Sequence, residues 1–290
     1  MDWQEIYRER LTTPGEAMKA VRSGDTVMIP IFPPGTRARA LAARRDELKD
    51  VTVRLLAPAA DPGWLRTPDE STFKVEFELY IGDFARFVMD ERRGTYLPNL
   101  FSTGMKAYDD GRHDDVHVPD VLICTVSKPN RAGYCHFGVH NWVQRSYARR
   151  CPIVIAQVDE SLTQVHGDVY IHVSEIDQFV EFTPPPLDRA DFDQIVSTIA
   201  DESRREGWKQ LAGELPSLQV LSSVRAIIPA LAAGDVRSLL GMGEPPPEAA
   251  PIARHLHGLI QDGDTIQIGV GEPSRGMVRL GAFAGRKHLG

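Results

Sequence analysis

The chain has 290 residues, of which 42% are hydrophobic and 25% are charged, and its formal net charge is −7. These values are ordinary for a soluble globular protein, and the negative charge excludes a general attraction to nucleic acid or to acidic membranes. No apolar run approaches the ~20 residues that a bilayer span needs, and the charged N-terminus is unlike a signal peptide. We therefore expect neither a nucleic-acid partner nor a membrane partner.

The candidate metal-binding patterns in the sequence are weak. Cys124, Cys135 and Cys151 form a sparse set without CxxC or metal spacing, which is typical of buried thiols in a reducing compartment. We predict a cytoplasmic location on this basis. Two histidines and two aspartates gather at residues 113–117, but the charged, glycine-flanked context favours a solvated turn. No metal site is predicted.

The first part of the chain alternates helix and strand patterns. Pro14 begins a helix, and residues 26–31 form a short apolar strand. A loop at 33–35 leads into a helix at 36–48, and a strand at 51–56 follows. Strand, loop, helix and strand in this order predict a parallel α/β sheet.

The same pattern continues to about residue 180 and then changes. The further predicted strands are 73–81, 121–126, 152–158 and 169–173, and the further predicted helices are 83–92 and the later part of 137–149. Beyond them come two long helical patterns, 188–211 and 218–240, and a proline-rich linker at 241–248. The predicted domains are therefore 1–187, a helical insertion and linker at 188–248, and a further domain that begins at 249–290.

A repeat links the two ends of the chain. Residues 24–34 and 263–273 both start with Gly-Asp-Thr and both end with proline. In the first copy a helix and a strand follow, whereas in the second copy the corresponding strand should begin at about Gly290. A lone strand and helix cannot bury a core of their own. We therefore expect residues 249–290 to pack against a missing piece or a partner chain.

Three segments resemble one enzyme family. Residues 165–177 contain His-Gly-Asp-x-x-Ile-His-Val-Ser-Glu-Ile-Asp, and residues 127–138 read Ser-Lys-Pro-Asn-Arg-Ala-Gly-Tyr-Cys-His-Phe-Gly. Residues 262–271 read Asp-Gly-Asp-Thr-Ile-Gln-Ile-Gly-Val-Gly. These strings are similar to motifs of the acetyl-CoA hydrolase/transferase family, which includes 4-hydroxybutyrate and butyryl-CoA:acetate CoA-transferases. The resemblance covers residues 5–182 and 250–290.

The resemblance implies an α/β fold of the class I CoA-transferase type, with one complete parallel-sheet domain and the first strand–helix unit of a second. It also implies an active site between two tandem domains, where a glutamate forms a glutamyl-CoA thioester. Coenzyme A is then part of the substrate, the other substrate is a carboxylate, and no permanently bound cofactor is predicted.

The sequence departs from the family in three places. Glu272 stands where the family has a further glycine, Asn130 stands near the family's acidic residue, and 188–245 resembles an insertion. No residue aligns with the family's catalytic glutamate, so no catalytic residue is predicted. The favoured function is a subunit of an acyl-CoA transferase or hydrolase, with the nucleophile supplied by a second polypeptide that completes the C-terminal domain. The alternatives are a non-catalytic acyl-CoA-binding or regulatory subunit, or a fragment of a longer CoA-transferase.

Two loops are candidates for the reaction centre. Small residues between a strand and a helix let backbone N–H groups approach a ligand closely, although a plain turn is the alternative. The predicted oxyanion or CoA-binding loop contains Gly269, Gly271 and Pro273, and the corresponding loop of the first repeat contains Pro33, Pro34 and Gly35. Glu272 is predicted to face solvent near a helix N-terminus, where the dipole favours its charge, rather than to replace the nucleophile.

Other residues are predicted to line the substrate cleft. Ser127 and Asn130 are assigned to the acyl side. Alternating spacing would put His172, Ser174 and Ile176 on one face at the end of a strand. The resemblance makes this strand end a wall of the cleft, with a structural polar cluster as the alternative. The basic run at 37–45 predicts a helix with a solvated basic face, and contact with the phosphates of CoA is the alternative.

Overall fold

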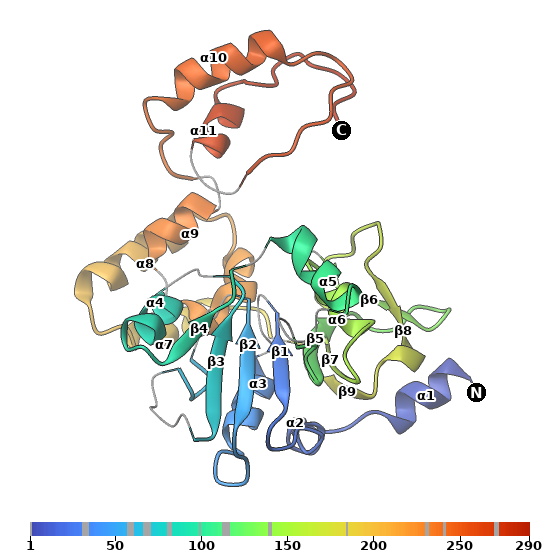
Figure 1. Ribbon diagram of the computed structural model, residues 1–290. Helices are drawn as coiled ribbons and strands as arrows, with labels where there is room; N and C mark the ends of the chain where they lie inside the picture. The colour runs from blue at the N-terminus through green and yellow to red at the C-terminus, as the bar shows by residue number, and fades with distance from the viewer. Residues whose placement is uncertain are drawn as a thin grey trace. The chain divides into compact units, whose positions relative to one another are not determined.

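We describe the protein from a computed structural model of the 290-residue chain (Figure 1). The structure describes residues 2–30, 35–56, 61–65, 71–79, 83–98, 100–111, 117–138, 141–183, 185–229, 232–239, 242–269 and 273–290. The chain divides into two compact units, residues 1–186 and 187–290. The finer division predicted at residue 248 stays a prediction.

A parallel sheet organises the first unit. The described residues contain seven strands in this sheet, in the order β4-β3-β2-β1-β5-β7-β9, and neighbouring strands pair in parallel. The chain runs outward from β1 to β4 and then returns to β5 on the other side of β1. In open α/β sheets ligands generally bind beyond the carboxyl ends of the strands at such a reversal, which here falls between β1 and β5. The strands are β1 (Thr26–Ile29), β2 (Val51–Leu55), β3 (Phe73–Phe77), β4 (Gly94–Tyr96), β5 (Val121–Val126), β7 (Ile153–Val158) and β9 (Gln178–Glu181).

Short helices cover the sheet. Thr13 caps α2 through its hydroxyl, which accepts the N–H of Glu16 at 3.3 Å. The predicted helix 36–48 ends early, at Ala42. The turns after it are held by Arg44, whose Nη1 donates to the backbone carbonyls of Met18, at the end of α2, and of Val21. The helices of this unit are α1 (Trp3–Glu9), α2 (Pro14–Met18), α3 (Gly35–Ala42), α4 (Asp83–Asp90), α5 (Phe101–Asp109) and α6 (Gln144–Ala148).

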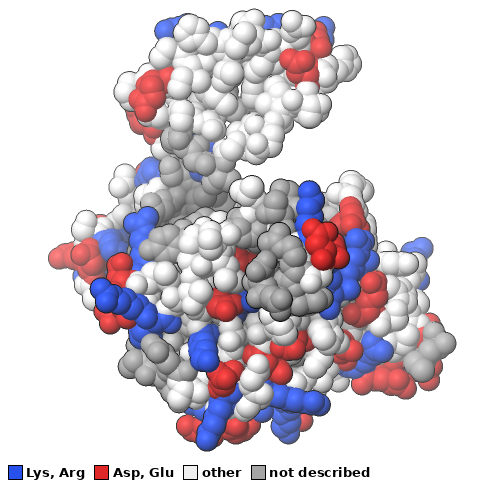
Figure 2. All heavy atoms as spheres, in the orientation of Figure 1, with Lys and Arg blue, Asp and Glu red and all other residues white. Residues whose placement is uncertain are grey.

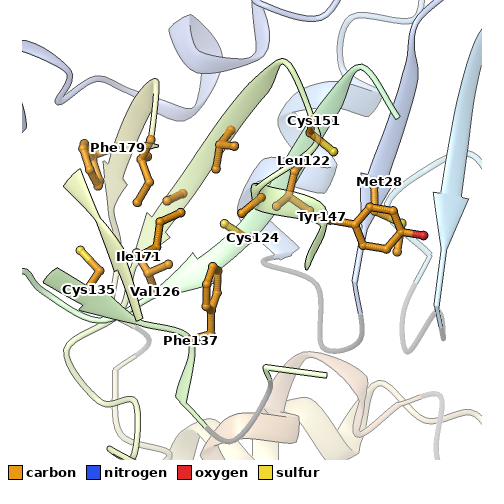
Figure 3. Packing of buried hydrophobic residues seen from close by; sticks show 14 of the residues in the cluster. Met28, Leu122, Cys124, Val126, Cys135, Phe137, Tyr147, Cys151, Ile171 and Phe179 are labelled. Carbon is orange, nitrogen blue, oxygen red and sulfur yellow. The ribbon is translucent and has the colours of Figure 1, made fainter. Parts of the chain in front are cut away.

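The central strands are apolar because both faces of the sheet are covered. Figure 1 shows α5 in front of the sheet and α3 behind it. On the front face, Leu122 and Cys124 of β5 belong to a buried cluster that also contains Tyr147 of α6 (Figure 3). Alternation turns Val121 and Ile123 toward the other face, and both are fully buried there. The predicted α/β class with a buried β5 is therefore confirmed.

The strand predicted at 169–173 exists but lies in another sheet. β8 (Tyr170–His172) pairs antiparallel with β6 (Tyr134–His136), and these two strands form a separate ribbon. The place beside β7 belongs to β9 instead. Asp177 positions β9, because its Oδ2 accepts the N–H of Val154 at 2.8 Å while its own N–H donates to the Val154 carbonyl at 2.9 Å.

The second unit is helical over its first part. The long helix predicted at 188–211 is broken, because α7 ends at Ser197 and Asp201 caps a new helix by accepting the N–H of Arg204 at 2.8 Å. Trp208 of that helix is buried, and its ring lies 6.5 Å from the ring of Phe192. The elements are α7 (Arg189–Ser197), α8 (Glu202–Glu214), the 3₁₀ helix η3 (Leu218–Ile227), α9 (Ala233–Leu239), α10 (Ala249–Leu259) and α11 (Ser274–Arg279). Because η3 and α9 are separate elements, the prediction of a single helix at 218–240 is wrong.

The repeat seen in the sequence is also present in the backbone. Gly24 and Gly263 have φ angles of 87° and 88°, a region that favours glycine. Each donates its N–H to a lysine carbonyl at 3.0 Å, from Lys49 and Lys287 respectively. The two turns are therefore copies of one structure.

The strand that follows this turn forms in the first copy alone. β1 is buried between β2 and β5, whereas residues 264–269 do not form a β-strand in the structure. Among the described residues, their strand-like backbone pairing is with Gly290, whose N–H donates to the Asp264 carbonyl at 3.0 Å and whose carbonyl accepts from Ile266 at 2.8 Å. Ile268 is 44% exposed, while its counterpart Ile29 is 1% exposed.

The surface charges and the helix lengths are those expected from the composition of the chain. Acidic and basic side chains are mixed over the face shown in Figure 2. None of the helices in the described part of the chain combines the length and the apolar character that a bilayer span requires.

Candidate functional site

The motifs at 127–138 and 165–177 meet in the ribbon of β6 and β8. Tyr134 lies opposite His172, and their ring centroids are 5.0 Å apart. Because β6 follows β5 in the chain, this ribbon lies beyond the carboxyl end of β5. The structure therefore brings the turn that carries Ser127 and Asn130 next to the turn that carries His172 and Ser174.

Ser127 and Asn130 shape the turn between β5 and β6. The Ser127 hydroxyl donates to the Lys128 carbonyl at 2.9 Å and accepts the N–H of His136 at 3.0 Å. Asn130 Oδ1 accepts two backbone N–H groups, from Ala132 at 2.9 Å and from Tyr134 at 3.0 Å. Both side chains hold their own loop, and their assignment to the acyl side of a cleft stays a prediction.

Gly133 completes this turn because no other residue fits there. Its φ angle is +80°, and a Cβ at this position would lie 2.7 Å from the Trp3 Cβ and 2.8 Å from His172 Nε2. The glycine of the Gly-Tyr pair in this motif thus lets α1 and the His172 ring approach the backbone.

His172 and Ser174 form a compact turn rather than one strand face. β8 ends at His172, and residues Val173–Glu175 form a 3₁₀ turn, so the alternation predicted through Ile176 stops there. His172 Nδ1 accepts the N–H of Ser174 at 3.2 Å and lies 2.8 Å from its hydroxyl. Glu175 Oε1 accepts the N–H of His172 at 3.0 Å, which closes the turn.

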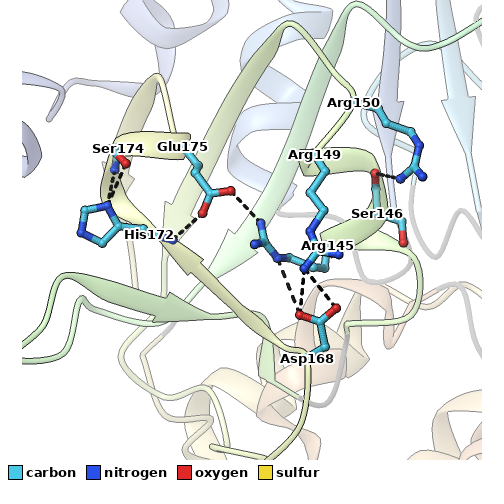
Figure 4. A network of polar contacts seen from close by, with 8 residues as sticks. All are labelled: Arg145, Ser146, Arg149, Arg150, Asp168, His172, Ser174 and Glu175. Atoms are coloured by element: carbon cyan, nitrogen blue, oxygen red, sulfur yellow. Dashed lines mark hydrogen bonds and ion pairs between the residues drawn. The ribbon is translucent and has the colours of Figure 1, made fainter. Parts of the chain in front are cut away.

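Ion pairs connect this turn to α6 (Figure 4). Glu175 Oε2 accepts from Arg145 at 2.9 Å, and Arg149 contacts both oxygens of Asp168, at 3.0 and 3.1 Å. Burial alone would raise the pKa of Glu175, but the N–H of His172 and the Arg145 guanidinium hold it below its ordinary value. These contacts occupy the polar residues of the motif, and their predicted role in a cleft wall is untested.

A chain of polar side chains is buried against the sheet, and the sequence analysis did not predict it. Arg54 of β2 meets Glu76 of β3 at 2.9 Å and donates to the Tyr108 hydroxyl at 3.0 Å. The Tyr147 hydroxyl lies 3.4 Å from that of Tyr108 and donates to Glu78. Burial raises the pKa of Glu78 above its ordinary value, although the Tyr147 hydroxyl and Arg54 oppose the shift. The feature of the sequence that could have indicated this chain is Arg54, a charged residue inside the otherwise largely apolar segment 51–56.

The thiols are buried, and no metal-ligand cluster is found among the described residues. Cys124, Cys135 and Cys151 are free and buried, and burial raises the pKa of each thiol to about 12. The described part of the chain contains no group of three or more ligand side chains suited to a metal ion. Of the histidine and aspartate cluster at 113–117, residues 113–116 lie outside the described residues.

The predicted reaction loops are described in part. Gly35 is the first residue of α3, while Pro33 and Pro34 lie outside the described residues. In the second unit, Pro273 directly precedes α11, and a Cβ added at Gly269 would lie 3.7 Å from the Ser274 hydroxyl. Gly271 and Glu272 also lie outside the described residues, so the predicted roles of this loop are untested.

The basic run at 37–45 differs from the predicted solvated face. Arg39 is exposed, but Arg37 is completely buried, and its Nη2 donates to the Cys124 carbonyl at 2.5 Å. The period of the helix predicts which residues face the sheet, yet it does not indicate that a guanidinium fills that position.

The chain belongs to the acetyl-CoA hydrolase/transferase family. The model of the acetyl-CoA hydrolase/transferase N-terminal domain matches residues 1–186. The 4-hydroxybutyrate coenzyme A transferase of Clostridium kluyveri is 28% identical over 191 residues, which cover 65% of this chain and 43% of that protein. The succinyl-CoA:cyclohexane-1-carboxylate CoA transferase of Geobacter metallireducens is 26% identical over 185 residues, covering 63% of this chain and 41% of that enzyme.

Solved structures share the fold. RipA from Yersinia pestis superposes with a TM-score of 0.69 at 23% identity, covering 100% of this chain and 57% of that chain. The 4-hydroxybutyrate CoA-transferase of Porphyromonas gingivalis gives a TM-score of 0.56 at 22% identity and covers 99% and 55% of the two chains. This chain therefore spans about half the length of the proteins it matches.

Proposed function

We propose that the chain is a subunit of an acyl-CoA transferase or hydrolase that acts on CoA thioesters, with the glutamate nucleophile supplied by a partner chain. Membership of the family supports the class of reaction, and the relatives' names describe acyl-CoA transfer. The observation that carries the partner is the exposure of Ile268 in a segment whose counterpart, β1, is buried between two strands. A chain that adds strands beside residues 264–269 would cover it.

The chemistry requires two contributions. Thioester exchange needs a carboxylate that attacks the acyl carbon and N–H donors that stabilise the developing oxyanion. In this proposal the loop from Gly269 to Pro273 supplies donors or binds CoA, and the partner's carboxylate forms the covalent intermediate. CoA takes part as substrate, together with a free carboxylic acid.

Covalent trapping tests the division of labour. The purified chain, incubated with acyl-CoA, should yield no hydroxylamine-sensitive or borohydride-sensitive adduct. Mass spectrometry of proteins that co-purify with the full chain should identify a second polypeptide, and the adduct should form on it in the reconstituted complex. A stoichiometric adduct on the chain alone would overturn the partner's role. Acyl-CoA binding in a complex that forms no adduct would favour a non-catalytic binding subunit.

The role of the loop has its own test in that complex. If Gly271 donates its N–H to the oxyanion, Gly271→Val should lower turnover on the order of 10²-fold, the scale of one oxyanion donor. Glu272→Gln is the matched control and should be nearly neutral. Full turnover of the Gly271→Val complex at an unchanged thermal midpoint would reduce the loop to a simple turn.

A further inference from the structure

Arg37 is a buried cation to which the described residues offer no anion. Its side chain is fully covered, and it lies in the first turn of α3. Nη2 donates to the Cys124 carbonyl at 2.5 Å, while Nε and Nη1 have no hydrogen-bond partner within the part of the chain that the structure describes. An unpaired buried charge is unfavourable, because the surroundings replace water poorly.

Arg54 shows how this protein treats a buried arginine with a structural role. Its Nε pairs with Glu76 at 2.9 Å, and its Nη1 donates to the Tyr108 hydroxyl at 3.0 Å and to the His117 carbonyl at 2.8 Å. Around Arg37, by contrast, burial lowers the pKa to about 9, opposed by the Cys124 thiol. Arg37 is still charged at neutral pH, and no carboxylate among the described residues pairs with it.

The position of Arg37 in the fold suits a ligand. α3 is the element that follows β1, and Cys124 lies on β5, so the guanidinium is at the reversal of strand order where α/β sheets bind ligands. The N–H groups of a first helical turn have no intrahelical partners, and the helix dipole favours an anion there. Thr125 and Gln157, neighbours on β5 and β7, add polar side chains to the face of the sheet that α3 covers.

The free donors of Arg37 match a carboxylate. The Nη2 atom carries two hydrogens, one beside Nε and one beside Nη1. Whichever of them the Cys124 carbonyl takes, one edge of the guanidinium keeps two parallel N–H groups, which is the geometry that binds a carboxylate bidentately. Full burial favours a singly charged group over a phosphate, because the additional ionised oxygens would need donors of their own.

We propose that Arg37 and the first turn of α3 bind the carboxylate of a small organic acid. This deepens the proposed function, on which the identity of the ligand as the acid substrate rests. Anion binding itself needs neither the partner chain nor a thioester. Arg37 thereby becomes a substrate-binding residue of the first unit.

The first test titrates the full chain with sodium butyrate, with sodium chloride and inorganic phosphate at matched ionic strength. The readouts are the ¹⁵N–H resonance of Arg37 Nε and the thermal midpoint, because a ligand of the native state raises that midpoint. Butyrate should shift the resonance saturably and raise the midpoint, and chloride should do neither. Absence of a saturable shift would overturn the site, and an equal response to phosphate would overturn the assignment to a carboxylate.

Variants separate ligand binding from structural support. Arg37→Met keeps a long unbranched side chain without the charge, so the midpoint in the absence of acid should stay unchanged or rise. Butyrate binding should weaken by roughly 10- to 100-fold, the scale of a charge-assisted hydrogen bond. Arg39→Met, an exposed position on the same helix, should leave binding unchanged. A large fall of the midpoint in Arg37→Met, with butyrate still bound, would make Arg37 structural and overturn the proposal.

A second variant covers the case in which Arg37→Met fails to fold. Arg37→Lys keeps the charge but loses the planar pair of donors, so it should fold and bind butyrate weakly. Wild-type affinity in Arg37→Lys would overturn the bidentate geometry. Arginine-dependent butyrate binding in a complex without CoA chemistry would support this site and defeat the proposed function. Transfer activity without any butyrate response would support the proposed function and overturn this site.

Discussion

Asp25 and Asp264 make the same hydrogen bond at two distant places in the chain. Each Oδ2 accepts the backbone N–H of the residue three positions earlier, at 2.7 Å from Arg22 and at 2.8 Å from Gln261. In both copies the aspartate carbonyl also accepts an N–H from the returning chain, at 2.9 Å from Thr52 and at 3.0 Å from Gly290. One turn thus initiates a strand in the first unit and presents an uncovered segment in the second.

Removal of either carboxylate should loosen its own copy of the turn. Asp25→Ala should cost about 1 kcal/mol of unfolding free energy, by analogy with the loss of a helix cap, because a backbone N–H loses its acceptor. Asp264→Ala should act on residues 249–290. Hydrogen exchange of the Arg22 and Gln261 amides measures each effect locally. Exposed Asp46 provides the control, and unchanged protection in the variants would contradict this prediction.

Gly133→Ala should destabilise the first unit strongly. The positive φ angle alone costs an alanine roughly 1–3 kcal/mol, and the new Cβ must also displace Trp3 or the His172 ring. Gly15→Ala is the matched control, since nothing lies within 4 Å of a Cβ there and it lies in α2, where alanine is favoured by up to about 1 kcal/mol. Chemical denaturation of both variants decides the matter, and equal midpoints would show that the turn adapts.

Glu78 should make the first unit less stable as the pH rises. Burial raises the pKa of Glu78, so the folded state binds this proton more tightly than the unfolded state. The resulting stabilisation is complete below the ordinary pKa of 4.5 and is lost as the pH rises through the raised folded value. Urea unfolding of the wild type and of Glu78→Gln between about pH 4 and 8 should therefore give diverging curves. Parallel curves would show that Glu78 titrates normally.

Loss of Arg54 should be among the most damaging changes in the sheet. Arg54→Ala leaves Glu76 without its cation and the Tyr108 hydroxyl without its donor, which should cost about 3–5 kcal/mol. Glu76→Ala in the same background should recover part of that loss, because it removes the unpaired carboxylate. A double-mutant cycle from urea midpoints measures the coupling. Additive losses would mean that the pair is energetically independent.

The long apolar strands could be predicted from sequence, and the short polar ones could not. The predicted boundaries of β5 are the observed ones, because six successive apolar or small residues suit a strand buried on both faces. β4, β6 and β9 have three or four residues with mixed polarity, so their pairing depends on tertiary contacts. The same ambiguity applies to β8, because the sequence predicts a strand at 169–173 but not its antiparallel pairing with β6.

Side-chain roles in the candidate site were harder to predict. The motifs at 127–138 and 165–177 identify the family. The side chains of Asn130 and His172, however, accept hydrogen bonds from backbone N–H groups of their own turns. Arg37 lies on the helix face that the spacing turns toward the sheet, where an apolar residue is the ordinary expectation. Periodicity does not show that the described residues offer this charge no anion, because its neighbours come from segments distant in the sequence.

The reactivity of the cysteines can report how often the first unit opens. All three belong to the first unit, where burial raises the pKa of each thiol to about 12. At neutral pH the reactive thiolate is therefore almost absent, and an alkylating reagent can reach it when the sheet opens. The alkylation rate of the intact chain then reports the opening of the first unit alone, whether or not the second unit has found a partner.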